Sequence, residues 1–159
     1  MRAVLHKKNV SAIFWLPFIL FLIHSIEEIF FGFPGWATEH FGSTTFWFFI
    51  QHHIPLFILA FVSSYFASRK NGSAFWRVLA TAWQIQFVVN GLFHTIMTIA
   101  FKEYSPGVVT GFLLFLPFTY YFIVEVWKAK LLTSFQFKIA FIIGPLVAFA
   151  AIASLWLES

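Results

Sequence analysis

Long apolar stretches alternate along the whole chain with short connections that are polar or contain glycine. A helix needs roughly 20 predominantly apolar residues to cross the hydrocarbon core of a bilayer. The sequence offers five such stretches, which lie at residues 10–31, 44–66, 74–101, 106–127 and 135–157. None of the connections is long enough for a second domain. The pattern therefore predicts an all-α protein, a single integral membrane bundle of about five transmembrane helices over residues 1–159.

The basic residues are distributed unevenly between the two sides of the predicted bundle. Three precede the first stretch, three flank the second connection and three flank the fourth, whereas Lys102 falls on the opposite side. Cytoplasmic connections carry an excess of Lys and Arg, so we expect a cytoplasmic N-terminus and an external C-terminus. The first stretch contains polar residues and no small-residue cleavage site, so we expect a retained span and not a removed leader.

The composition supports a membrane protein and narrows the possible partners. Hydrophobic residues make up 60% of the chain and charged residues 10%, and 25 Phe with 7 Trp are too many for one small core to bury. The net charge of +4 forms no basic patch, so we expect membrane lipid and not nucleic acid as a partner. Because the chain has no Cys, any metal would be held by His, carboxylates and backbone oxygen.

The first stretch contains a histidine and two glutamates at helical spacing. Glu27 and Glu28 follow His24 by three and four residues, so all three lie on one side of a helix. Two adjacent carboxylates are costly in hydrocarbon, because both desolvation and mutual repulsion oppose their ionisation. A metal, a permanent basic partner or proton chemistry would explain the pair.

The second and third stretches also contain polar side chains. Gln86, Asn90 and His94 follow one another at spacing four, which predicts a polar stripe that faces protein. His52 and His53 are neighbours in the second stretch. Neighbours on a helix point about 100° apart, so we expect only one of them to face inward.

The polar groups of the first three stretches lie at one depth. At about 1.5 Å per residue, the histidines all lie roughly 10 to 12 Å inside the outer end of their spans. We therefore expect one site composed of His24, Glu27, Glu28, Asn90, His94 and one of His52 and His53. The alternative is a set of interhelical hydrogen bonds that only hold the bundle together.

The outer connection before the fourth stretch has the features of a helix start. Ser105 suits an N-cap and Pro106 the first helical position. The N–H groups of Gly107 and Val108 would then point outward and favour a negatively charged group. The motif is equally well explained as a structural cap. If a substrate binds here, the expected contact residues are Gln86, Tyr104, Ser105 and Gly107.

Three motifs follow one another along the chain: His24-x-x-Glu27-Glu28, Asn90-x-x-x-His94 and Tyr104-Ser-Pro106-Gly107-x-x-Thr110. Together they resemble the signatures of the HXXEE family of small, mainly bacterial integral membrane proteins. The resemblance covers roughly residues 15 to 125. It implies a multi-pass protein of the bacterial inner membrane and supports one common site, but it implies no reaction, because the function of that family is essentially uncharacterised.

The first functional hypothesis is a membrane-embedded, metal-dependent hydrolase. Two histidines and a carboxylate would hold Zn²⁺ or another divalent metal and leave a position for water. The substrate would be a lipid or another amphiphile with an ester or amide bond, reached at the outer leaflet. The expected metal ligands lie among His24, Glu28, His94, His52 and His53. The expected catalytic residues are Glu27, Glu28, Asn90 and His94.

Three other functions remain open from the sequence. In a metal-free isomerase, Glu27 or Glu28 would donate a proton to a lipid and His94 would accept one. A faint similarity to membrane sterol isomerases of the emopamil-binding type, which also have His and Glu within helices, agrees with that alternative. Intramembrane His and Glu also occur in proton-coupled or ion-coupled transporters. The chain could finally be an accessory membrane subunit, and it could form a homo-oligomer.

Overall fold

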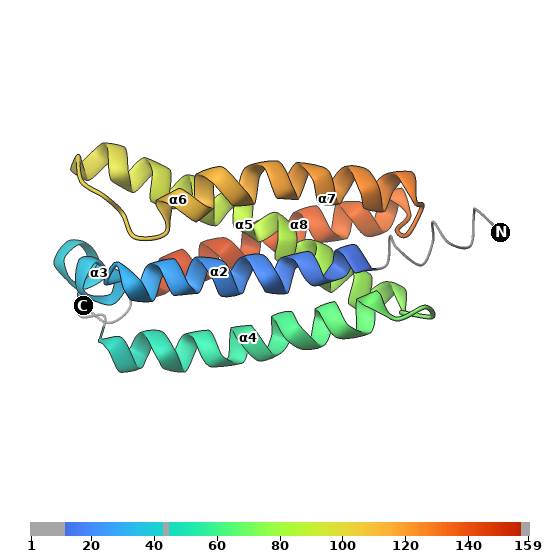
Figure 1. Ribbon diagram of the computed structural model, residues 1–159, viewed down its shortest axis with the longest axis horizontal. Helices are drawn as coiled ribbons and strands as arrows, with labels where there is room; N and C mark the ends of the chain where they lie inside the picture. The colour runs from blue at the N-terminus through green and yellow to red at the C-terminus, as the bar shows by residue number, and fades with distance from the viewer. Residues whose placement is uncertain (1–11, 43–44, 157–159) are drawn as a thin grey trace.

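The structure, a computed structural model, describes residues 12–42 and 45–156 (Figure 1). The described residues form helices and no strands, which confirms the predicted fold class. The short helices are η1 (Ala12–Trp15), α3 (Phe33–Phe41), α6 (Val108–Thr110) and the π-helical turn η2 (Gly111–Phe115). The longer ones are α2 (Leu16–Phe30), α4 (Phe46–Ser68), α5 (Ala74–Phe101), α7 (Leu116–Lys128) and α8 (Ser134–Ser154).

Five helical segments of the described chain are long and apolar enough to cross a membrane. They are Ala12–Phe30, Phe46–Ser68, Ala74–Phe101, Val108–Lys128 and Ser134–Ser154. Each corresponds to one predicted stretch, although positions 10, 11, 44 and 157 of those stretches lie outside the described residues. The start of η1 and the end of α8 lie at opposite ends of the bundle, as an odd number of spans requires (Figure 1).

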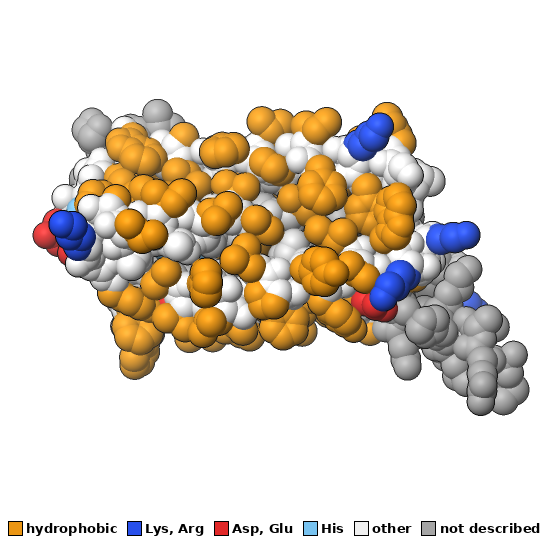
Figure 2. All heavy atoms as spheres, turned by 90° about the horizontal axis from the view of Figure 1, so that it is seen from above, with side chains coloured by type: hydrophobic (Ala, Val, Ile, Leu, Met, Phe, Trp, Pro, Cys, Tyr) orange, Lys and Arg blue, Asp and Glu red, His pale blue; other side chains and the backbone are white. Residues whose placement is uncertain are grey.

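The surface between the two ends of the bundle is apolar. On the face that Figure 2 shows, charged side chains gather at the ends and hydrophobic side chains cover the middle. Phe30 and Phe135 are 81% and 71% exposed, which water would penalise and lipid would not. The chain is therefore a multi-pass membrane protein. Arg2, Lys7 and Lys8, on which part of the predicted orientation rests, lie outside the described residues.

Helix α5 forms the centre of the bundle and packs against α2, α4, α7, α8 and η2. At the interface of α5 with η2, two glycines face each other. A Cβ added to Gly91 would lie 2.7 Å from the carbonyl oxygen of Gly111. This near contact of two backbones brings the half of α5 that contains His94 against the chain segment that precedes η2.

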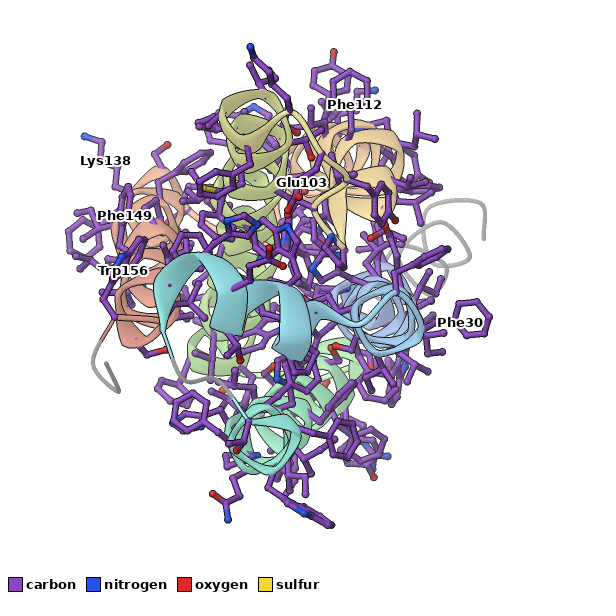
Figure 3. The ribbon with its side chains drawn as sticks, turned by 90° about the vertical axis from the view of Figure 1, so that its left-hand side faces the viewer. Phe30, Glu103, Phe112, Lys138, Phe149 and Trp156 are labelled. Carbon is purple, nitrogen blue, oxygen red and sulfur yellow. The ribbon has the colours of Figure 1, made fainter. Side chains whose placement is uncertain are left out.

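Helix α3 is an element that the hydropathy pattern did not predict, since it lies in the connection between the first two spans. Gly32, with a φ of 75°, ends the preceding turn, and Pro34 stands in the first turn of α3. The helix crosses one end of the bundle (Figure 3). Its buried Phe33 and Trp36 pack in a cluster with Phe49 of α4 and reach Ile152 of α8. That end of the bundle is therefore covered by protein.

Candidate functional site

Three imidazole rings from three helices meet the carboxylate of Glu28. The Nε2 atoms of His24 and His94 lie 3.4 Å and 3.5 Å from Glu28 Oε1, and His53 Nε2 lies 3.3 Å from Oε2. His24, Glu28 and His94 are each less than 5% exposed. The spacing of four residues places His24 and Glu28 one above the other on α2. Residues from α2, α4 and α5 thus come together in one buried cluster.

The rings are held by their other nitrogen, so every Nε2 faces the carboxylate. In each ring, Nδ1 is hydrogen-bonded to an oxygen of the protein. The partners are Thr110 Oγ1 for His24 (2.7 Å), Ser105 Oγ for His94 (3.0 Å) and the Phe49 carbonyl oxygen for His53 (2.9 Å). This is the arrangement of metal-binding histidines, whose second nitrogen is commonly fixed by a neighbouring oxygen.

The distances within the cluster suit a bound cation. Two ligand atoms on a tetrahedral zinc ion, each about 2.1 Å from the metal, lie roughly 3.4 Å apart. Glu28 Oε1 is at this separation from both His24 Nε2 and His94 Nε2, and neither nitrogen has a hydrogen-bond partner among the described residues. One ligand atom from each of the three residues lies within 4.8 Å of the others. They can hold a divalent metal as two nitrogens and one oxygen.

The backbone at Gly107 packs directly against two of these rings. It has a φ of 106°, and a Cβ added to it would lie 2.7 Å from His24 Cε1 and 2.8 Å from His94 Cε1. No side chain fits between the loop and the rings. Glycine is therefore required here both for the backbone conformation and for the close approach.

Glu27 contacts this loop and not the imidazoles. Its Oε1 accepts hydrogen bonds from the N–H groups of Gly107 and Val109, each at 3.1 Å, and its Oε2 accepts one from Thr110 at 2.8 Å. The sequence suggested that amides at this helix start could bind an anion of the substrate. In the structure the anion is the chain's own Glu27, and α6 begins at Val108, two residues later than predicted.

Tyr104 donates a further hydrogen bond from its hydroxyl to Glu27 Oε1. Burial raises the pKa of Tyr104 above its ordinary value, and the hydrogen bond to Glu27 adds to this effect. The tyrosine thus remains a hydrogen-bond donor at neutral pH. Ser105 is buried and bound to His94, so it supports a histidine instead of capping the helix as expected.

A cavity of about 610 Å³ extends from the histidine cluster between α4 and α8. This volume is in the usual range of small-molecule sites. Its wall is mainly apolar, with Phe21, Leu56 and Phe87 among the lining residues, and His24, Glu28, His53 and His94 lie along it. Gln86 and Asn90 of α5 also line the cavity. A reactive centre at this position would be reached from an apolar compartment.

The structure brings together most of the residues that the sequence singled out. Of the two neighbouring histidines, His53 faces Glu28, whereas His52 is exposed at the edge of the cavity and binds the Phe48 carbonyl oxygen. The sequence pattern did not indicate a role for Thr110, which ends the third motif and holds His24. It also gave no signal for Phe33 of α3, whose ring centroid lies 5.6 Å from that of His94.

The fold and the cluster define a class of protein, an all-helical, multi-pass membrane protein with a buried group of histidines around a glutamate. Within that class, the chain belongs to the family described as proteins of unknown function with an HXXEE motif, whose profile matches residues 15–122. The motif itself is His24, Glu27 and Glu28. No curated protein and no solved structure matches the chain.

Proposed function

We propose that the protein is a membrane-embedded, metal-dependent hydrolase that cleaves an ester or amide bond in a lipid or another amphiphile. The metal would be Zn²⁺ or another divalent ion, and the reaction would take place at the outer leaflet of a cell membrane, in bacteria the inner membrane. The observation that carries the proposal is the convergence of His24 Nε2, His94 Nε2 and Glu28 Oε1 at metal-ligand spacing.

The proposed roles follow from the contacts of each side chain. His24, His94 and Glu28 would hold the metal, which would supply an activated water and polarise the substrate carbonyl. His53 is the best placed general base. Its Nδ1 donates to the Phe49 carbonyl oxygen, so in the neutral ring Nε2 is free to accept a proton at the cavity wall.

The two remaining residues of the predicted catalytic set would have different roles. Glu27 already accepts three backbone N–H groups and the Tyr104 hydroxyl, so we assign it to positioning and not to proton transfer. Asn90 lies one helical turn from His94 and lines the cavity, and its Oδ1 has no partner among the described residues. It is suited to orient the substrate beside the metal.

The direct test is the metal content of the purified full chain, prepared without chelators. We expect about one equivalent of metal per chain in the wild type, and a loss of at least tenfold in His24→Ala, His94→Ala and Glu28→Gln, since each removes a ligand. His52→Ala is the matched control, because this neighbouring histidine faces away from Glu28, and it should keep its metal.

The hydrolase proposal would be refuted if the wild-type protein bound no stoichiometric metal. The same cluster would then favour the metal-free alternative, because three imidazoles around one carboxylate also suit proton transfer. Lipid-modifying activity that survives complete removal of metal would point to that acid/base isomerase.

A further inference from the structure

One face of α5 presents polar groups to the cavity, and these groups lack partners in the described protein. Gln86 is 8% exposed and lines the cavity, yet its side chain makes no hydrogen bond with the described residues. Asn90, one turn further along, lines the cavity with an unpartnered Oδ1. The indole Nε1 of Trp83, one turn before Gln86, is also buried without a partner. All three lie on the face of the helix that leads to His94.

Unpartnered amides are unusual in a buried apolar setting, because each unmet hydrogen bond opposes folding. Other polar side chains of α5 avoid this cost through the backbone: Thr81 donates to the Arg77 carbonyl oxygen at 2.7 Å and Thr95 to that of Gly91 at 2.8 Å. A glutamine cannot stay in this position at no cost unless the cavity supplies a partner. Gln86 lines the cavity, so the occupant of the cavity is the available partner for its amide.

The cavity is accessible to lipid from its side. Helices α4 and α8 both pack on α5 but hardly on each other, and the cavity lies between them. Pro55 on α4 and Ala150 and Ala151 on α8 line it and are exposed on the flank of the bundle. Helix α3 crosses the end of the bundle (Figure 3). The ring centroid of its Phe41 lies 4.7 Å from that of Trp156. An occupant would thus come from the bilayer.

The positions of Gln86 and His94 on α5 set the distance between the two polar regions of the cavity wall. Gln86 precedes His94 by eight residues, which is about 12 Å along a helix. Between and around them the wall is hydrocarbon and aromatic, with Phe21, Phe87 and Leu56. An occupant that satisfies both ends must be mostly apolar, with a reacting group at the histidines and one hydrogen-bonding group further along its chain.

We propose that the substrate is a single-chain lipid with a hydroxyl, keto or amide group within its chain about 12 Å from the reacting bond, and that Gln86 binds this group. The inference rests on the proposed hydrolase and names the substrate of the same site. Asn90 acts near the reacting bond, whereas Gln86 selects lipids by the polar group within their chain. A plain hydrocarbon chain fits the cavity less well because it leaves the Gln86 amide without a partner.

The test measures fatty acid binding by the purified full chain in lipid nanodiscs, since a fatty acid is the product that hydrolysis of such a lipid releases. The probes are stearic acid and a series of hydroxystearic acids in which the hydroxyl moves along the chain. We expect the wild type to bind one region of the series about two- to tenfold more tightly than stearic acid, as one additional hydrogen bond gives.

Substitution separates Gln86 from the rest of the cavity. Gln86→Leu should abolish the preference and bind stearic acid as well as any hydroxylated chain. Gln51→Leu is the matched control, because Gln51 also lines the cavity but is exposed on α4, and it should keep the preference. Metal content, measured on the same samples, should be unchanged in both variants.

Equal binding of the whole series by the wild type overturns the inference, and so does a failure of the wild type to bind any of the chains. Both results come from unsubstituted protein, so a variant that fails to fold does not prevent the decision. A preference that persists in Gln86→Leu also overturns it. If metal is bound but no preference is seen, this inference fails and the proposed metal centre stands. If a preference is seen but no metal is bound, the selection of the chain by Gln86 stands and the proposed metal centre fails.

Discussion

At the scale of single residues, two adjacent glutamates of one motif have different surroundings. Within the described residues, the polar partners of Glu28 are three imidazole nitrogens, at 3.3 to 3.5 Å. Glu27, the next residue towards the N-terminus, is bound by backbone N–H groups and a tyrosine hydroxyl. Neighbours on a helix point about 100° apart, so one carboxylate faces the α4 and α5 histidines and the other faces the loop before α6. The motif therefore combines a candidate ligand with a positioning residue.

Gly107 gives a prediction at this scale. In Gly107→Ala, the new Cβ would clash with both His24 and His94, and the backbone would be strained at a φ of 106°. We expect the free energy of unfolding to fall by about 1 to 3 kcal/mol from strain alone, and metal binding to be lost. Thermal unfolding and metal content measure the two effects.

Gly35→Ala provides the control for this substitution, because nothing lies within 4 Å of a Cβ at Gly35 in α3. It should leave both quantities close to those of the wild type. A Gly107→Ala protein with full metal content would show that the loop does not need its close contact with the rings.

At the scale of elements, the site depends on how the start of the fourth span is fixed against α2. The segment from Gly107 to Thr110 is bound by Glu27 through three backbone N–H groups. Thr110 in turn holds His24 and donates to the Gly107 carbonyl oxygen at 3.3 Å. The turn η2 then lies against α5 through Gly91 and Gly111. These contacts set the position of His24 and His94 relative to each other.

Glu27→Gln tests this coupling. An amide in place of the carboxylate loses the charge and directs an NH₂ group at backbone donors, so we expect a loss of about 1.5 to 3 kcal/mol in stability. Metal affinity should fall about 10- to 100-fold, as is typical when an outer partner of a ligand is changed, whereas Glu28→Gln should abolish binding. Titration with Zn²⁺ after chelation measures the metal affinity of both variants.

Glu103→Gln is the matched control for the charge change, because Glu103 is exposed and bound to His40 of α3. It should bind metal as the wild type does. If Glu27→Gln removed metal as completely as Glu28→Gln, Glu27 would be a direct ligand and its positioning role would be refuted.

At the scale of the whole molecule, the arrangement of five spans leaves one side of the site open. Helix α3 crosses the end of the bundle and α5 forms the floor of the cavity, which in the described part of the chain reaches the histidines between α4 and α8. The residues that α8 presents there, Ala150 and Ala151, are small. A small side chain at this flank leaves space for a lipid chain.

Ala151→Trp should close this route. We expect it to weaken the binding of the best fatty acid probe by roughly tenfold or more, because a bulky ring must be accommodated in the occupied cavity, while metal content stays at the wild-type level. Ala153→Trp, which adds the same ring to an exposed position of α8 that does not line the cavity, should have no such effect. Equal binding by both variants would argue against access between α4 and α8.

The sequence by itself determined the class of fold and which polar side chains share a helix face. Five apolar stretches define five spans, since hydropathy over about 20 residues is a local property. The spacing of His24 and Glu28, and of Gln86, Asn90 and His94, places each set on one helix face, which depends only on helix geometry. These predictions needed no knowledge of how the helices pack. The orientation of the bundle in the membrane stays a prediction.

Only the tertiary structure decided which helix each face meets. It separated Glu27 from Glu28, selected His53 over His52, and placed Gly107 and Thr110 against His24. The amphipathic helix α3 and the cavity between α4 and α8 also appeared only there. The physical reason is that helix rotation and crossing depend on contacts between distant residues, such as the approach of Gly91 to Gly111, which periodicity along one chain segment does not encode.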